Sequence, residues 1–195
     1  MATKTAQTTT TVPRLKRLYT EELVAKLQKE LELDNPHRVP KLEKITLNVG
    51  IGKHKDDKHY HEVVVNTLRK ITGQQPVDRM AKKSIATFKI RAGMNRIGVG
   101  VTLRGKNMYE FLDRLVNVSL PRVRDFHGVP TKGFDKAGNY SLGINEQSIF
   151  PELNFEDTQL LHGLQINFVI KTEDKAHAEA LLRAYGMPFE KEEKR

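Results

Sequence analysis

The chain has 195 residues, of which 38% are hydrophobic and 29% charged, enough for one domain with a modest core. It contains no cysteine, which excludes disulfides, thiolate nucleophiles, iron–sulfur clusters and cysteine-based zinc sites. The longest uncharged stretch, Thr158–Ile170, has 13 residues and is too short to span a bilayer.

The net charge of +9 comes almost entirely from one window. Arg79–Lys106 carries eight Lys or Arg residues and no Asp or Glu, whereas residues 146–195 carry six basic and ten acidic residues. A focal cluster of this kind indicates a surface that meets a polyanion at a defined place. We therefore expect a nucleic-acid partner, with a general polyanion binder as the alternative.

The N-terminal residues 1–12 are Thr-rich and have no apolar run, so no secretory signal is predicted. A short organelle transit peptide is one interpretation, because basic residues follow. We expect instead a disordered tail over 1–12 and a single domain over 13–195. Pro13 can open a helix, and apolar residues at steps of four from Leu15 to Leu31 predict that helix, which Asn35-Pro36 ends.

The next segments predict a strand and then a second helix. Apolar residues alternate with polar residues or glycine over Ile45–Gly52, as in a half-buried strand. A polar loop, His54–Lys58, leads to a helix with one apolar face, which Gly73 ends.

The basic window itself predicts a β-hairpin. Two alternating runs, Ala86–Arg91 and Ile97–Arg104, are joined by a basic tip at Gly93–Arg96. The phase of the first run turns Phe88, the only aromatic residue of the window, inward. Without an exposed aromatic platform, binding of single strands by base stacking is not expected.

The remaining elements complete the predicted fold. Asn107 is expected to cap a third helix, whose inward residues are Met108, Phe111, Leu112, Leu115 and Val116. Strands are predicted over Tyr140–Ile144 and Leu164–Ile170, and a closing helix from about Glu173 to Tyr185. The expected class is α+β: a mixed or mainly antiparallel sheet with helices packed on one face, plus a basic β-hairpin loop.

The strand phases leave polar side chains on the face away from the core. Thr46 and Asn48 point outward from one strand, and Thr102 and Arg104 from another. Hydroxyl, amide and guanidinium groups fit the 2′-hydroxyls, base edges and phosphates of the wide minor groove of RNA. Phosphate contacts would come from Lys82, Lys83, Lys89, Arg91, Arg96 and Lys106. The alternative is an ordinary solvated sheet face.

Two motifs could indicate other chemistry. Gly100–Lys106 approaches the spacing of a phosphate-binding loop, but Asn107 stands where Ser or Thr must hold magnesium; an RNA-associated NTPase is therefore only the alternative function. The segment His54–His61 is rich in His and Asp, yet His59 and His61 fall on different helix faces, which favours a solvated loop over a metal site. No nucleophile, base and orienting group occur together, so we expect no enzyme, cofactor or metal.

Several motifs, in order along residues 38–189, resemble the family of universal large-ribosomal-subunit protein number five, bacterial type. They are Val39–Gly50, Ile71–Gln74, Ala81–Ile85, Val101–Leu112, Leu120–Phe126, Phe134–Tyr140, Phe150–Glu152 and Gly186–Phe189. The resemblance implies a structural protein that binds 5S rRNA and helps attach it to the central protuberance of the large ribosomal subunit.

The resemblance also implies roles for particular residues. The positions that contact 5S rRNA in the family correspond to Asn48, Gln74 and Thr102, and we add Lys82, Lys83 and Arg104 as rRNA-binding residues. The loop that reaches the P-site tRNA corresponds to about Lys82–Gly98, with Lys89, Arg91 and Arg96 as contacts. An intersubunit bridge to a small-subunit head protein would involve Arg122, Arg124, Lys132 and Tyr140.

Further partners implied are 23S-type rRNA and neighbouring 5S-binding ribosomal proteins, without a membrane. The expected location is cytoplasmic and ribosome-bound, with an organelle matrix as the alternative. The chain departs from the family at Arg79, where a small hydroxyl residue is usual, and at the tip Gly93–Gly98, which is one residue longer and has an added charge. The Thr-rich extension and the His-rich loop are also particular to this chain.

Overall fold

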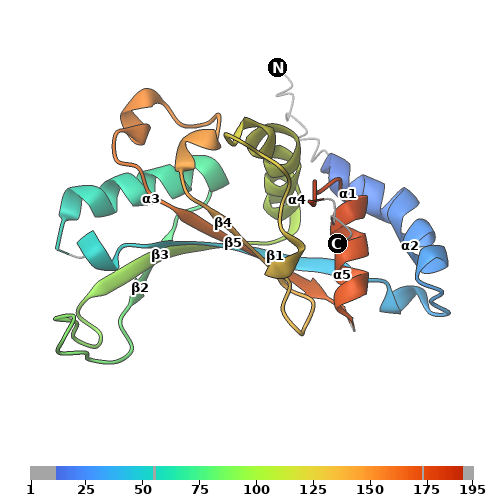
Figure 1. Cartoon of the computed structure of the whole chain (residues 1–195), viewed down its shortest axis with the longest axis horizontal. Helices are drawn as coiled ribbons and strands as arrows, with labels where there is room; N and C mark the ends of the chain where they lie inside the picture. Colours follow the sequence, from blue (N-terminus) through green and yellow to red (C-terminus); the bar gives the residue numbers. More distant parts are fainter. Residues whose placement is uncertain (1–11, 55, 173, 191–195) are drawn as a thin grey trace, which may run out of the picture.

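The computed structural model describes residues 12–54, 56–172 and 174–190, and these residues build a five-stranded sheet with helices (Figure 1). The strand order is β2-β3-β1-β5-β4, and every neighbouring pair is antiparallel. The strands are β1 Lys41–Gly50, β2 Val77–Met80, β3 Arg96–Leu103, β4 Tyr140–Ile144 and β5 Leu164–Lys171. The predicted α+β class is confirmed. The tail predicted over 1–12 lies, apart from Val12, outside the described residues.

The predicted helices are present. The first is a continuous helical segment: α1 Arg14–Leu18, a π-helical turn Tyr19–Leu23 and α2 Val24–Glu30. The others are α3 Lys58–Thr72, α4 Gly105–Arg114 and α5 Lys175–Ala184. α4 continues through a π-helical turn, Leu115–Ser119, and a 3₁₀ turn, Leu120–Arg122. Further 3₁₀ turns are Pro36–Arg38, Gly52–His54, Thr131–Gly133, Gln147–Ile149 and Phe155–Thr158. None of the described helices has the length and apolar character needed to cross a membrane.

Local interactions explain where α3 begins and ends. The Asp57 side chain accepts a hydrogen bond from the backbone N–H of Tyr60 at 3.1 Å, which satisfies one of the free amides of the first turn. At the other end Gly73 has φ +67°, and its N–H donates to the Arg69 carbonyl. Glycine adopts this left-handed backbone without strain, so the helix ends where the sequence predicts.

The predicted bounds of the first strand and the predicted cap of α4 were wrong. β1 begins at Lys41, four residues before the expected start, because its first residues pair with β5 around a bulge between Leu42 and Lys44. It ends at Gly50, two residues before the expected end, and a 3₁₀ turn over Gly52–His54 follows. Asn107 does not cap α4; Arg104 precedes the helix with an extended backbone, and Gly105 has φ +57°. The positive φ of Gly105 lets the chain turn directly from β3 into α4, which leaves Asn107 exposed in the first turn.

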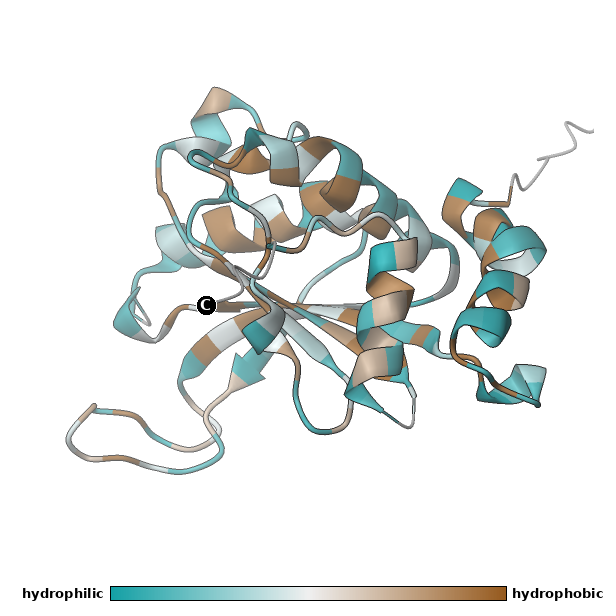
Figure 2. Ribbon diagram, turned by 45° about the vertical axis from the view of Figure 1, so that its right-hand side comes forward, coloured by the Kyte–Doolittle hydropathy of each residue, from teal (hydrophilic) through white to brown (hydrophobic). Residues whose placement is uncertain are grey.

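The hydrophobic core lies between the sheet and the helices α3 and α4. Figure 2 shows apolar residues on the sides of these helices that face the sheet. Fully buried core side chains include Ile45, Leu47, Leu68, Leu112, Ile166 and Phe168. Because the described helices α3 and α4 cover the central strands from one side, the opposite face keeps its polar residues, in agreement with the predicted alternation.

The N-terminal helical segment is held against α4 and α5. The Arg14 guanidinium makes two bonds to the Asp113 carboxylate, at 3.0 Å from Nε and 2.5 Å from Nη2. The rings of Tyr19 and Tyr109 both lie against the buried ring of Tyr185, with centroids 6.2 and 6.4 Å apart respectively. Burial raises the pKa of Tyr185, so this cluster stays neutral and joins the segment to the main core.

We predict that His162 makes folding stability depend on pH in mildly acidic solution. Its ring is buried, and burial lowers its pKa from the usual value despite a contact with the Leu160 carbonyl. The unfolded chain therefore binds a proton near pH 6.5 that the folded chain does not bind. The free energy of unfolding should thus fall as pH falls through this range. Urea unfolding at pH 7.5, 6.5 and 5.5 measures this.

The matched comparison is His162→Gln, which removes the titrating group. We expect a smaller loss of stability between pH 7.5 and 5.5 in this variant than in the parent. Parallel pH profiles for the two proteins would contradict the assignment of this pH dependence to His162.

Candidate nucleic-acid interface

The open face of the sheet carries a continuous row of polar side chains. β-sheet register places Thr46 of β1 opposite Thr102 of β3 on one side and Asn167 of β5 on the other, and Asn167 lies opposite Ser141 of β4. All four side chains are partly or fully exposed. Hydroxyl and amide groups therefore cross four adjacent strands on one face of the sheet. The helices α3 and α4 lie on the other side of the sheet (Figure 1).

A second row runs beside the first. Asn48 lies opposite Gly100 of β3 and Gln165 of β5, and Gln165 lies opposite Gly143 of β4. Gln165 Nε2 donates to Asn167 Oδ1 at 3.3 Å, which links the two rows. Gly100 and Gly143 have no side chains, so the backbone beside the amides of Asn48 and Gln165 stays accessible. A rigid partner can therefore approach the sheet closely.

Gln74 joins this surface from outside the sheet. It follows the C-terminal Gly73 of α3, and its Nε2 donates to the backbone carbonyl of Thr102 at 3.3 Å. Thr102 and Asn48 are diagonal neighbours on adjacent strands. The structure thus brings Asn48, Gln74 and Thr102 together, although Gln74 had no signal of its own in the strand pattern. Arg104 is exposed immediately after β3.

The predicted hairpin is wrong in its first strand. β3 pairs with β2, not with Ala86–Arg91, and residues 81–95 form a long basic loop between these two strands. Within this loop Ile85 and Ile90 exchange backbone bonds of 2.9 and 3.1 Å, and Ser84 Oγ accepts from the N–H of Ala92 at 3.0 Å. The segment extends beyond the sheet, where no neighbouring strand supports its alternating pattern.

Phe88 is 65% exposed, so the prediction that its ring points inward is also wrong. The basic loop projects away from the sheet and the described helices (Figure 1), so its apolar residues remain at the surface. Exposed apolar side chains of the loop and the adjoining strand residues are Val77, Met80, Ile85, Phe88, Met94 and Ile97.

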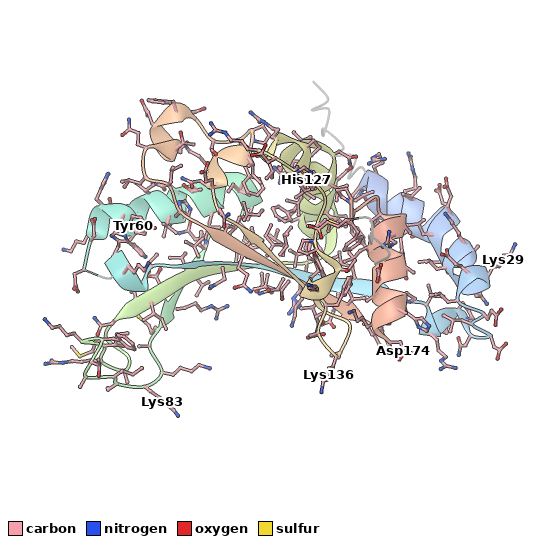
Figure 3. The ribbon with its side chains drawn as sticks, in the orientation of Figure 1. Lys29, Tyr60, Lys83, His127, Lys136 and Asp174 are labelled. Atoms are coloured by element: carbon pink, nitrogen blue, oxygen red, sulfur yellow. The ribbon has the colours of Figure 1, made fainter. Side chains whose placement is uncertain are left out.

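The basic loop carries exposed cations, and an acidic residue lies at its base. Lys82, Lys83, Lys89 and Arg91 are exposed, and Lys83 points away from the body of the protein (Figure 3). Arg96, at the base of the loop, is also exposed and forms an ion pair with Asp78, at 3.1 Å from Nε to Oδ2. Asp78 Oδ1 also lies 2.8 Å from His61 Nε2, so one carboxylate connects β2, β3 and α3.

The residues expected at an intersubunit bridge fall into two groups. Arg122, Arg124 and Lys132 are exposed, and the first two border an open groove of about 530 Å³ beside β4. Tyr140 has no exposed surface, and its hydroxyl donates to the Pro130 carbonyl at 2.8 Å. Its side chain is therefore part of the core beneath this segment, which disagrees with a direct contact to a partner.

The geometry does not support the alternative phosphate-binding loop. Residues 100–103 belong to β3 and are hydrogen-bonded to β1, and Gly100 also pairs with β2. Their amides are used within the sheet and cannot surround a phosphate. Lys106 lies in α4 and approaches Glu110 at 3.6 Å.

The His-rich segment makes local contacts. His54 stacks on Tyr60 with ring centroids 4.3 Å apart, and His61 binds Asp78. Among the residues that the structure describes, no three His, Asp or Glu side chains are grouped so that they could hold a metal ion.

Two family models match consecutive parts of the chain. The model described as ribosomal protein L5 covers residues 35–91, and the model for the C-terminus of the same ribosomal family covers residues 96–189. The chain belongs to the ribosomal protein L5 family. It is thus a ribosomal protein, and the resemblance found in its motifs is confirmed.

Relatives from this family match almost the whole chain. A large ribosomal subunit protein uL5 from Dichelobacter nodosus is 53% identical over 176 residues, which are 90% of this chain and 98% of that protein. Proteins of the same name from Wolinella succinogenes and Leptospira biflexa are 49% and 52% identical over 178 residues. These matches cover 91% of this chain and 96% and 97% of those two proteins.

Proposed function

We propose that this ribosomal protein L5 family member is a non-catalytic, structural component of the large ribosomal subunit that binds 5S rRNA on the open face of its sheet. One observation carries the proposal: Asn48, Gln74 and Thr102 come together on a flat, polar, helix-free surface. Their amide and hydroxyl groups suit the 2′-hydroxyls and base edges in a wide RNA minor groove. Lys82, Lys83 and Arg104 supply phosphate contacts beside this surface.

The proposal assigns the RNA a fixed orientation. The basic loop lies at one end of the open face, and Lys136, on a loop that descends on the same side, lies toward the other end (Figure 3). An RNA helix held between these two loops would help attach 5S rRNA to the central protuberance, next to 23S-type rRNA and neighbouring 5S-binding ribosomal proteins. The protein acts in the cytoplasm, bound to the ribosome.

In this proposal the part of the basic loop around Lys89 and Arg91 contacts the P-site tRNA. Both side chains are exposed, and the ion pair between Arg96 and Asp78 supports the base of the loop. The segment Arg122–Lys132 faces a small-subunit head protein in an intersubunit bridge. Its exposed cations Arg122, Arg124 and Lys132 make this contact, and Tyr140 supports the segment from within the core.

A titration against two RNAs tests the proposal. The purified protein is titrated with 5S rRNA and with an unrelated folded RNA of similar size, at about 50 and 200 mM salt. We expect a preference for 5S rRNA that persists at the higher salt, because shape and 2′-hydroxyl contacts depend little on counterion release. Equal binding of both RNAs that disappears at higher salt would show that the basic window acts as a general polyanion binder.

A further inference from the structure

Arg79 lies on β2, one of the two edge strands of the sheet, in register with Gly98 of β3. Its neighbour Asp78 turns toward His61 of α3, on the helix side of the sheet. Alternate residues of a strand point to opposite faces, so Arg79 projects onto the open face. Its side chain runs along β3, because a Cβ placed on Gly98 would lie 3.9 Å from Arg79 Cβ and one placed on Gly100 would lie 3.4 Å from Arg79 Nε.

The two glycines provide the space that the Arg79 side chain occupies. The same hypothetical Cβ atoms on Gly98 and Gly100 would each lie 3.6 Å from Asn48 Oδ1. The guanidinium of Arg79 and the carboxamide of Asn48 therefore border the same strip of exposed backbone. We call Arg79, Gly98, Gly100 and Asn48 the Arg79 trough.

The charge of Arg79 has no partner within residues 12–54, 56–172 and 174–190, where no hydrogen bond or ion pair of its guanidinium is found. The adjacent carboxylate, Asp78, is on the other face and is already bound by His61 and Arg96. The exposed guanidinium lies along a flat surface beside an amide, and no acidic side chain of the described residues neutralises it there. It is therefore positioned to bind an anionic group of a ligand. Its planar fork matches the two oxygens of a phosphate.

We propose that Arg79 binds a backbone phosphate of the RNA on the open face and sets the position of that RNA relative to Asn48. This inference rests on the proposed function and adds a positioning contact to it. The minor groove of an RNA helix is bordered by phosphates, and 2′-hydroxyls and base edges lie between them. The amide and hydroxyl rows extend from β3 across β1 and β5 to β4, and Arg79 lies beside them on the edge strand β2, where a bordering phosphate would pass.

Two substitutions separate charge from geometry in titrations with 5S rRNA. Arg79→Gln should weaken binding about tenfold, because a charge-assisted bond is lost, and should reduce the salt dependence by the equivalent of about one phosphate contact. Arg79→Lys should keep the salt dependence but lose several-fold in affinity, because an ammonium cannot make paired bonds to two oxygens. The control is Arg69→Gln, which removes an exposed cation on α3, on the helix side of the sheet. For this variant we expect less than about a twofold change in affinity for 5S rRNA.

A double-mutant cycle tests the trough itself. Gly100→Ala places a methyl group in van der Waals contact with Arg79 Nε, at 3.4 Å, and so fills part of the space between that side chain and the strand, which should weaken RNA binding in the parent protein. In the Arg79→Gln background the same change should cause little further loss, because the guanidinium that the methyl group contacts is already gone. Urea unfolding of each variant checks that the fold is intact.

The outcomes distinguish this inference from the proposed function. If Asn48→Ala weakens 5S rRNA binding and Arg79→Gln does not, the Arg79 contact is overturned and the sheet-face site stands. Additive effects of Gly100→Ala and Arg79→Gln would overturn the trough geometry. A parent protein without any preference for 5S rRNA would overturn both proposals.

Discussion

Tyr140→Ala is expected to lower the free energy of unfolding by about 3–5 kcal/mol, the range for removing a buried aromatic ring. Tyr140 has no exposed surface. Its ring lies against those of Phe134, Phe168 and Phe189, with centroids 4.6, 6.1 and 5.6 Å away. The substitution leaves a cavity between β4, β5 and Phe189, and urea or guanidinium unfolding measures its cost.

Tyr140→Phe is the matched control, because it keeps the ring and removes only the hydroxyl that donates to Pro130. We expect it to cost about 1 kcal/mol, the net value of one hydrogen bond. The proposed contact with a small-subunit head protein should be unchanged, since the hydroxyl is not at the surface. If Tyr140→Phe left stability unchanged but abolished that contact, Tyr140 would be a surface contact after all.

Asn48→Ala and Thr102→Ala are each expected to weaken binding of 5S rRNA by about 1–2 kcal/mol, or about five- to thirtyfold. In the proposed interface, each substitution would leave an RNA group without its polar partner in a desolvated environment. Both side chains are on the open face and belong to no core cluster, so the fold should tolerate their loss. Titration of each variant with 5S rRNA, alongside its unfolding curve, gives the comparison.

Asn66→Ala on α3 and Thr20→Ala in the N-terminal helical segment are the matched controls. Both remove the same chemical groups from exposed positions outside the sheet. We expect parental affinity for both. Parental affinity for Asn48→Ala and Thr102→Ala as well, with intact folding, would show that RNA does not bind on the open face.

Alternation and spacing predicted most individual elements correctly. The helix now seen over Lys58–Thr72 and the strands around Leu47, Val101 and Ile166 follow from apolar periods of 3.6 and 2. The outward direction of Thr46, Asn48 and Thr102 follows from the same strand phase. These features are local, because the direction of a side chain depends on the conformation of its own backbone.

Other features depend on which segments meet. The alternation over Ala86–Arg91 is typical of a strand, yet these residues lie beyond the sheet and form a loop, and Phe88 is exposed. Arg96 resembled a free cation, but Asp78, on the neighbouring strand, binds it. The spacing of apolar residues cannot show whether a segment will pair with another strand. It also cannot show whether a charged side chain will lie next to an opposite charge.

The α+β class, the polar face with Asn48 and Thr102, and the focal charge of Arg79–Lys106 could all be predicted from the order of the residues. The contact of Gln74 with Thr102, the place of Tyr140 in an aromatic core and the position of Arg79 over two glycines required the folded structure. These two groups of features depend on interactions over different sequence separations. Side-chain phase is set within a few residues, whereas burial, pairing and the grouping of a site are set by strand register and layer packing between distant segments.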